Sequence, residues 1–365
     1  MKVIKVNAPF VGEDEIRAVS EVIRGGMLAH GSVVEEFERE FAKYLGVPHL
    51  LTVSNGTVAL YVALKALGVG KDDEVIVPDF TFFATASTVV LAGATPVFAD
   101  IDLETYTIDP VSVDELITDK TKAIIAVHLY GHPAEMDEIM QIAKEHGLHV
   151  IEDCAQSHGA EYRGMKTGSI GDIGAFSFYA TKNLTMGEGG AISTKSRDIA
   201  EFVKLYRNHG QVRRYYHEMI GWNFRITNIQ AAIGLQQLRK LDQMNSRRRE
   251  IANIYREELG AIGSLHLPVE KSWASHVYHQ FTVWVEGEGV RDRLAEYLRK
   301  HGVQVGIHYP RPLHAQPALR KYLRKPCPNA ERASAHVLSL PMHPGLSNDD
   351  VLTVTKLVKS FFEST

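Results

Sequence analysis

The stretch from Ile151 to Gly190 begins with IEDCAQSHGA (151–160) and ends with AFSFYATKNLTMGEGG (175–190). Each part starts as a short apolar run, typical of a buried strand, and then turns to polar and small residues. Asp153 ends the first run, and Lys182 follows the second in a loop rich in hydroxyl residues and glycine. The pattern predicts one strand that ends at a carboxylate and another that leads into a tight loop with a lone lysine.

Around this stretch, apolar runs alternate with helix-period segments from about residue 48 to residue 194. We expect strands at 50–53, 75–77, 96–99, 123–128, 149–152, 174–178 and 190–193. Such alternation predicts an α/β fold with a mostly parallel, mixed sheet that is sandwiched by helices. Ligands of such sheets bind at the carboxyl ends of the strands, where Ser54, Asp153 and Ser177 are expected.

The regular alternation of strand-like and helix-like segments ends near residue 225. We expect a long helix at 226–258, an apolar run at 277–285, a charged helix at 290–301, a strand at 303–308 and a last helix at 349–362. A chain of 365 residues is long enough for two cores. The predicted division is a large α/β domain over 1–240, which includes the N-terminal segment, and a smaller α+β domain over 241–365.

Composition excludes several classes of protein. The formal charge of −4 gives no electrostatic reason to bind nucleic acid, and no apolar run approaches the roughly 18 residues of a membrane span. The first residues lack a secretory signal, and two cysteines without a C-x-x-C motif suit a reducing compartment. No H-E-x-x-H motif occurs, and Gly131 and Pro133 interrupt the pair His128 and His132. We expect a cytoplasmic protein without a metal, a membrane or a nucleic-acid partner.

Asp153 and Lys182 together suit the chemistry of pyridoxal phosphate (PLP). In that chemistry a lysine forms a Schiff base and a carboxylate keeps the pyridine nitrogen protonated. Either residue alone is weak evidence, since a strand-end aspartate can cap a turn and most lysines lie on the surface. Burial near a cationic ring would lower the pKa of the lysine and so suit proton transfer.

Further residues are candidates for holding such a cofactor. Ser54-Asn55-Gly56-Thr57 follows the first expected strand and opens a helix, where backbone N–H groups bind phosphate, although an ordinary N-cap has the same pattern. Ser177 alternates with two phenylalanines and so faces away from them, toward a phosphate or a backbone partner. Phe82 could stack on a ring or pack in the core.

In this order the motifs resemble the sugar aminotransferases of the DegT/DnrJ/StrS group, which have the fold-type-I PLP aminotransferase architecture. The resemblance covers nearly the whole chain and rests on 31–32, 54–60, 73–78, 93–98, 128–131, 152–156, 176–178, 182–183, 187–190, 223–225, 230–234 and 308–310.

The resemblance implies roles by position. Lys182 would be the catalytic Schiff-base lysine, Asp153 would pair with the pyridine nitrogen and Gln156 would contact the ring hydroxyl. The phosphate would be held by Gly56, Thr57 and Ser177, and Phe82 would stack on the ring. Asn223 would reach the phosphate bound to a neighbouring subunit, so a homodimer with active sites at the subunit interface is expected. The positions near the sugar nucleotide would be Glu188, Arg225, His308 and Tyr309.

The implied reaction is a ping-pong transamination from L-glutamate to a nucleotide-linked keto sugar. The run 307–314 is more similar to members that aminate C3 than to those that aminate C4, although His308 and His314 could also only pack between domains. Members with histidine in place of the lysine are dehydratases, and this chain keeps Lys182. A PLP-dependent lyase or dehydratase and a non-catalytic sensor of PLP or sugar nucleotide stay open as alternatives. A nucleotide-binding oxidoreductase is disfavoured, because no G-x-G-x-x-G follows the first strand.

Overall fold

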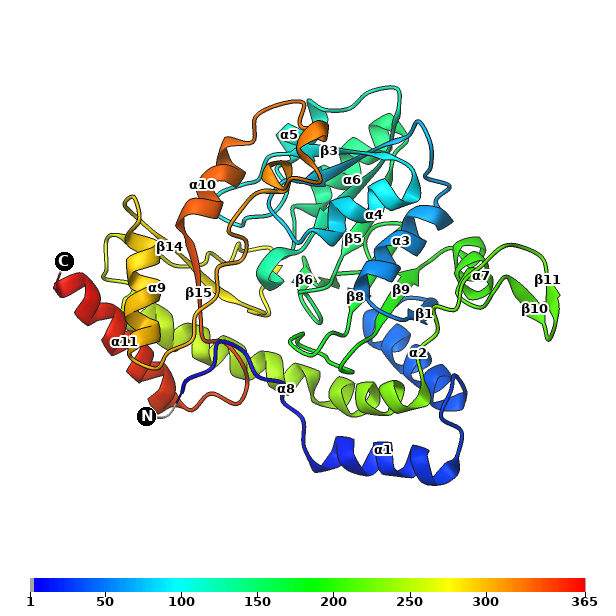
Figure 1. Cartoon of the computed structure of the whole chain (residues 1–365), viewed down its shortest axis with the longest axis horizontal. Coiled ribbons are helices and arrows are strands. Elements are labelled where there is room, and N and C mark those ends of the chain that lie inside the picture. The colour runs from blue at the N-terminus through cyan, green and yellow to red at the C-terminus, as the bar shows by residue number, and fades with distance from the viewer. Residues whose placement is uncertain (1–2, 365) are drawn as a thin grey trace.

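A seven-stranded sheet forms the centre of the molecule in a computed structural model that describes residues 3–364 (Figure 1). Its strands are β1 (His49–Val53), β2 (Glu74–Pro78), β3 (Thr95–Ala99), β4 (Thr121–Val127), β5 (His149–Asp153), β8 (Ile173–Ser177) and β9 (Gly190–Thr194). The spatial order is β1-β9-β8-β5-β4-β2-β3. Only β9 is antiparallel to its neighbours, and the other paired strands are parallel. The predicted α/β fold and all seven predicted strands are confirmed.

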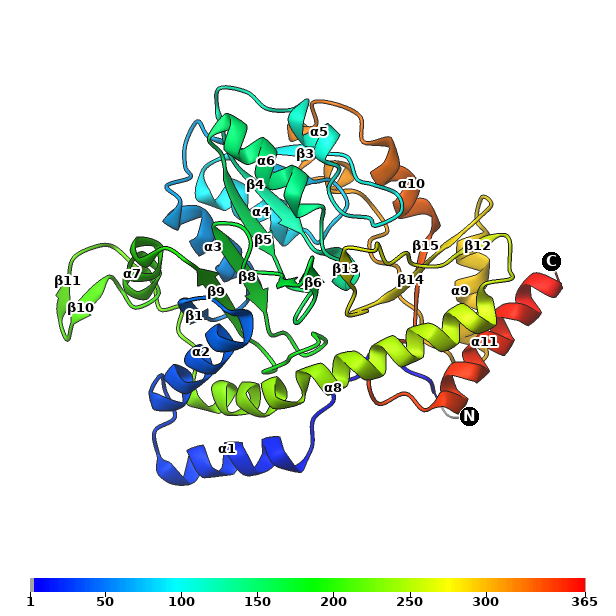
Figure 2. The ribbon, with the colours of Figure 1, turned by 180° about the vertical axis from the view of Figure 1, so that it is seen from behind.

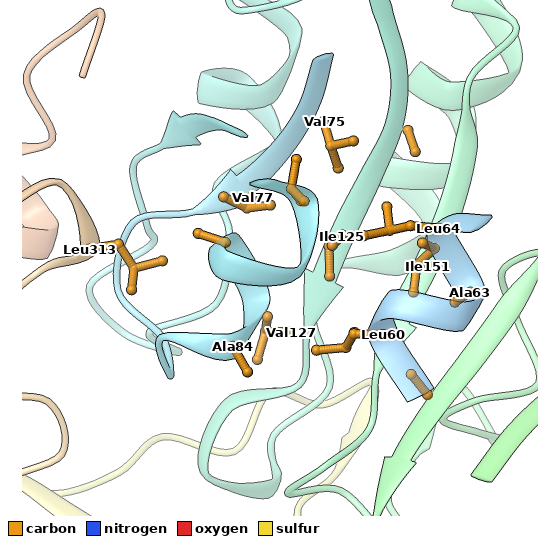
Figure 3. Packing of buried hydrophobic residues seen from close by; sticks show 14 of the residues in the cluster. Leu60, Ala63, Leu64, Val75, Val77, Ala84, Ile125, Val127, Ile151 and Leu313 are labelled. Atoms are coloured by element: carbon orange, nitrogen blue, oxygen red, sulfur yellow. The ribbon is translucent and has the colours of Figure 1, made fainter. Parts of the chain in front are cut away.

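Alternate residues of each strand pack on opposite faces of this sheet. Val75 and Val77 belong to one buried cluster and Ile76 to another, as a strand period of two requires. The first face is covered by α3 (Gly56–Ala66), α4 (Ala84–Ala92) and α7 (Arg197–Tyr206), and the second by α5 (Pro110–Asp114) and α6 (Met136–His146). Figure 3 shows Leu64 of α3 beside Ile151 of β5 in the first cluster.

A long helix, α8 (Asn228–Leu259), connects the sheet to the rest of the molecule (Figures 1 and 2). A capping box starts it, because the Thr227 side chain accepts from Gln230 N–H while the Gln230 side chain accepts from Thr227 N–H. Its first half packs against α1 (Glu13–Gly25) and α2 (Ser32–Leu45). Position 240 lies inside this helix, and the division at that residue stays a prediction.

The second core is built on a three-stranded antiparallel sheet. It comprises β12 (Leu265–His266), β14 (Phe281–Val285) and β15 (Val337–Leu340), packed with α9 (Val290–Lys300) and α11 (Asn348–Glu363). Ile4, from the N-terminal segment, belongs to the same cluster. The predicted strand at 303–308 is wrong. Val303 and Gly306 form single bridges to two different partners, and the His308 ring folds back over Gly306, so no continuous ladder forms.

Small elements complete the fold. A second three-stranded sheet joins β6 (Glu161–Tyr162), β7 (Met165–Lys166) and β13 (Ala274–Ser275), and a separate hairpin consists of β10 (Gln211–Arg213) and β11 (Tyr216–His217). This hairpin stands out at one end of the molecule (Figures 1 and 2). Among residues 3–364, no helix combines the length and apolar character that crossing a bilayer requires.

The chain returns to the first core after it has entered the second. Leu313, Leu319 and Cys327 belong to the cluster that covers the first face of the large sheet, as do residues of α10 (Pro328–His336). Figure 3 shows Leu313, on a separate segment, pointing toward the side of this cluster where Val77 lies. The segment after residue 308 is therefore part of the wall of the large unit.

Candidate active site

A cavity of about 870 Å³ lies where the parallel strands end. β1, β2, β4, β5 and β8 all point their carboxyl ends toward it, and residues at or just after these ends line it. It collects ten of the twelve predicted site residues: Gly56, Thr57, Phe82, Asp153, Gln156, Ser177, Lys182, Glu188, His308 and Tyr309. The topology therefore brings together side chains that lie more than 250 positions apart.

The beginning of α3 forms a cradle of the size of a phosphate group. The Asn55 side chain accepts from Val58 N–H at 2.9 Å and so fixes the first turn of the helix. A Cβ at Gly56 would lie 2.6 Å from Cβ of Ser177, closer than two such atoms can pack. Only glycine therefore allows this helix end to approach the strand that carries Ser177. Free N–H groups at the helix N-terminus and the two hydroxyls of Thr57 and Ser177 suit a phosphate dianion.

Asp153, the last residue of β5, presents its carboxylate to the cavity. Its Oδ1 accepts from Ala155 N–H at 3.1 Å and its Oδ2 from the Thr85 hydroxyl at 3.3 Å. Burial raises the pKa of Asp153, and the Ala155 N–H and the Lys182 ammonium only partly oppose that shift. A protonated ring nitrogen at this position would stabilise the ionised carboxylate and be stabilised by it.

Lys182 lies in the loop between β8 and β9 and faces the same cavity. Burial lowers its pKa to about 8, and the charge of Asp153 opposes the shift. Two histidines that also line the cavity, His279 and His308, have lowered pKa values because they are buried and close to Lys182; the pKa of His308 falls to about 4. Both shifts favour the neutral imidazole, which adds no positive charge beside the Lys182 ammonium.

Gln156 connects Tyr130, just after β4, to Tyr309 in the second half of the chain. Its Oε1 accepts from Tyr130 N–H at 2.7 Å, and its Nε2 donates to the Tyr309 hydroxyl at 3.1 Å. These two bonds fix the amide orientation, and one N–H of Nε2 stays available for a ligand oxygen. Phe82 lies on the same side, with its ring centroid 6.2 Å from that of Tyr309, and is 57% exposed.

The structure does not bring Asn223 and Arg225 into this cavity. Asn223 is exposed and bridges Asn208, while Arg225 donates to the Asn208 side chain and lines a separate cavity of about 740 Å³. In a single chain neither side chain can therefore contact a ligand held by Lys182.

Thr85 and His279 are among the residues at the site that the sequence motifs did not indicate. Thr85, in the first turn of α4, donates to Asp153. His279 lines the cavity, and its Nδ1 lies 3.1 Å from Oδ1 of Asn183, the residue after the lysine. No local motif marks His279, because it reaches the site from the second half of the chain.

These features together fit a fold-type-I PLP site: a lysine, a strand-end carboxylate, and a phosphate cradle that a side chain at position 56 would fill. A model of the DegT/DnrJ/EryC1/StrS aminotransferase family matches residues 9–359. The chain belongs to this family. The predicted family, fold and enzyme class, an aminotransferase, are thereby confirmed.

Relatives and solved structures of this family cover almost the whole chain. The dTDP-3-amino-3,4,6-trideoxy-alpha-D-glucose transaminase of Streptomyces venezuelae is 40% identical over 95% of this chain and 91% of its own length. The structure of S. venezuelae DesV in complex with a ketimine intermediate has a TM-score of 0.92 at 40% identity, covering 96% of this chain and 94% of that one. Spr1654 from Streptococcus pneumoniae, solved in its PLP-form, has a TM-score of 0.94 at 28% identity, with 99% of both chains covered.

Proposed function

We propose that this enzyme transfers an amino group from L-glutamate to a nucleotide-linked keto sugar, with a 3-keto sugar favoured over a 4-keto sugar. The observation that carries the proposal is the common cavity of Lys182, Asp153 and the Gly56–Ser177 cradle. The relative from S. venezuelae, named for a 3-amino sugar, supports the substrate class.

The residues of the chain have separate tasks in this proposal. The cradle of Gly56, Thr57 and Ser177 would hold the phosphate of PLP, Asp153 its ring nitrogen, and Phe82 one face of its ring. PLP, when bound, supplies an electron sink for a carbanion. Lys182 would form the covalent link and, once the amino acid has displaced it, would accept the proton from the substrate α-carbon and donate it to carbon C4′ of the cofactor.

The pKa of Lys182 suits both tasks. At a value of about 8, a useful share of the amine is neutral near pH 7, whereas an ordinary lysine is almost wholly protonated there. The neutral amine is the form that attacks a carbonyl carbon and accepts a proton. His308 and Tyr309, which line the same cavity, would contact the sugar.

Absorbance spectroscopy followed by product analysis tests the function. The protein with PLP should show a visible band that disappears on adding L-glutamate and returns with a keto-sugar nucleotide, leaving an amino sugar. A deoxygenated sugar instead of an amine would favour the dehydratase alternative. Binding of PLP or sugar nucleotide without turnover would favour the sensor.

We further propose that the active unit is a cytoplasmic homodimer in which Asn223 of one copy serves the phosphate site of the other. Asn223 is exposed and lies outside its own cavity. The hairpin and the residues that connect it to Asn223 carry exposed apolar side chains: Val212, Tyr215, Tyr216, Ile220 and Trp222.

Mixing two inactive variants tests the shared site. K182A and N223A should each be nearly inactive as homodimers, while a mixed dimer contains one site with both wild-type residues and should regain activity. Unchanged inactivity after subunit exchange, with dimers shown by light scattering, would contradict the shared site.

A further inference from the structure

Asp79 and His314 form a carboxylate–imidazole pair just outside the cavity. Nδ1 of His314 lies 2.5 Å from Oδ2 of Asp79, and the side chains are 11% and 0% exposed. The other carboxylate oxygen accepts from the backbone N–H of His314 at 2.9 Å, and Leu313 N–H donates to the Asp79 carbonyl at 2.7 Å. Three hydrogen bonds thus tie residues 313–314 to the end of β2.

The two partners belong to the two segments whose other residues form separate walls of the cavity. Asp79 precedes Phe80, Thr81 and Phe82 in the loop after β2, and His314 ends the segment that carries Tyr309. Tyr309 packs its ring against the loop after β2. Its ring centroid lies 6.1 Å from that of Phe80 and 6.2 Å from that of Phe82.

The segment from His308 to His314 is fixed at both ends. At its start, the Tyr130 hydroxyl donates to the His308 carbonyl, and Nδ1 of His308 lies 3.0 Å from the Ser339 hydroxyl. At its end, the His314 backbone N–H and Nδ1 both bond to the Asp79 carboxylate in the loop after β2. Pro310 and Pro312, between the ends, have fixed φ angles and no N–H to donate.

Burial of the Asp79 carboxylate lowers the stability of the fold unless hydrogen bonds compensate for the lost hydration. Burial raises the pKa of Asp79, and the bonds from His314 oppose the shift. An apolar residue of the same size would avoid this cost if only packing were needed. The carboxylate instead accepts two hydrogen bonds from a single residue of the opposite segment, which sets direction as well as distance.

We propose that Asp79 and His314 are positioning residues that hold the Tyr309 segment against the Phe82 loop and so set the width of the cavity on its sugar side. This inference rests on the proposed function for the identity of the ligand. It assigns neither residue a contact with substrate or cofactor.

Amide hydrogen exchange of the cofactor-free protein tests the positioning directly. H314A should raise exchange in residues 308–316 by on the order of tenfold, because the side-chain bond to Asp79 is lost and only the two backbone bonds remain. H314N should restore most of the protection, since its amide can donate from nearly the place of Nδ1. E331Q is the matched control, because Glu331 contacts the outer nitrogen of the same ring at 3.4 Å and is exposed.

Kinetics then tests the consequence for the sugar. In H314A, KM for the keto-sugar nucleotide should rise by roughly tenfold, while the spectral change with glutamate keeps nearly its wild-type rate. Unchanged exchange in 308–316, or a rise spread evenly over the whole chain, would overturn the inference. The exchange experiment uses protein without PLP and does not depend on the proposed function. If wild-type protein forms no visible band when PLP is added, the proposed function fails, but the exchange result still tests the positioning.

Discussion

β5 ends in two neighbouring carboxylates that face different regions of the molecule. Asp153 faces the cavity and accepts from one N–H and one hydroxyl. Glu152, one position earlier, faces the loop at 168–171 and accepts from the N–H groups of Gly168, Ile170 and Gly171, and it also lies 3.0 Å from Nε2 of His128.

The difference between these regions changes the pKa of the same chemical group in opposite directions. Burial would raise the pKa of Glu152, but the bonds from His128 and the backbone outweigh it and lower the pKa below its ordinary value. Burial raises the pKa of Asp153, which has fewer donors. Glu152 is therefore satisfied by the protein itself, whereas Asp153 retains capacity for a cation from outside. Cys154 lies close to Glu152 and His128, and these hydrogen bonds account for the cluster without an ion.

Removal of Lys182 should give the largest effect on the cavity side. We expect K182A to lower turnover by on the order of 10³-fold or more and to lose the visible absorbance band, because both the covalent link and the proton carrier are gone. Thermal stability should change little, since burial disfavours the charged lysine. Wild-type turnover in K182A would contradict the assignment of Lys182 as the catalytic lysine.

Neutralisation of Asp153 should come next. D153N keeps the size of the side chain but removes its charge, and we expect kcat to fall by about 10²-fold while the protein still folds and binds PLP. Steady-state kinetics and a circular dichroism spectrum measure the two effects. Kinetics close to wild type would show that this carboxylate does not serve the ring nitrogen.

A pH series should show the lowered pKa of Lys182. The neutral amine reacts with PLP, so the rate at which cofactor-free protein captures PLP should rise with pH up to about 8 and then level off. Between pH 6 and pH 8 the neutral fraction grows from about 1% to about 50%, so a rise of some tens of fold is expected. A rate that keeps climbing to pH 10 would show an ordinary lysine pKa.

E152Q sharpens the comparison on the other side of the strand. We expect kcat per folded molecule to change by less than about twofold, while unfolding free energy falls by about 3 kcal/mol or more, because a buried hydrogen-bonded charge is lost. Since the folded-state pKa of Glu152 is lowered, its contribution is complete above the ordinary pKa of 4.5 and is lost as pH falls through the lower folded value. The difference in Tm between wild type and E152Q should therefore shrink in acid. An unchanged Tm at pH 7 with impaired kcat would invert the assignment of the two carboxylates.

The sequence made the large sheet and one wall of the site predictable. Its strands are short apolar runs buried on both faces, and polar residues such as Ser54 and Asp153 directly follow or end them. Once a strand is predicted correctly, the position of the residues at its end is known as well. The order of the strands, with β9 inserted antiparallel between β1 and β8, leaves no such local signal.

The other wall was predictable only in part. The resemblance indicated His308 and Tyr309, but their segment is no strand, and its shape depends on contacts with Asp79, Tyr130 and Ser339. His279 reaches the cavity through the same kind of long-range packing. Such positions are set by the tertiary structure, and periodicity in one segment carries no information about them. The place of Asn223 and Arg225 relative to a second chain stays a prediction.

The return of the chain to its first core has a consequence for synthesis on the ribosome. The cluster on the large sheet includes Leu313, Leu319 and Ala333, and the second core joins Ile4 to residues of α11 such as Val354 and Phe361. Neither core can close until nearly the whole chain has emerged. The nascent protein therefore exposes apolar strands of the large sheet until the segment through α10 has emerged, and completion of α11 then allows the second core to close.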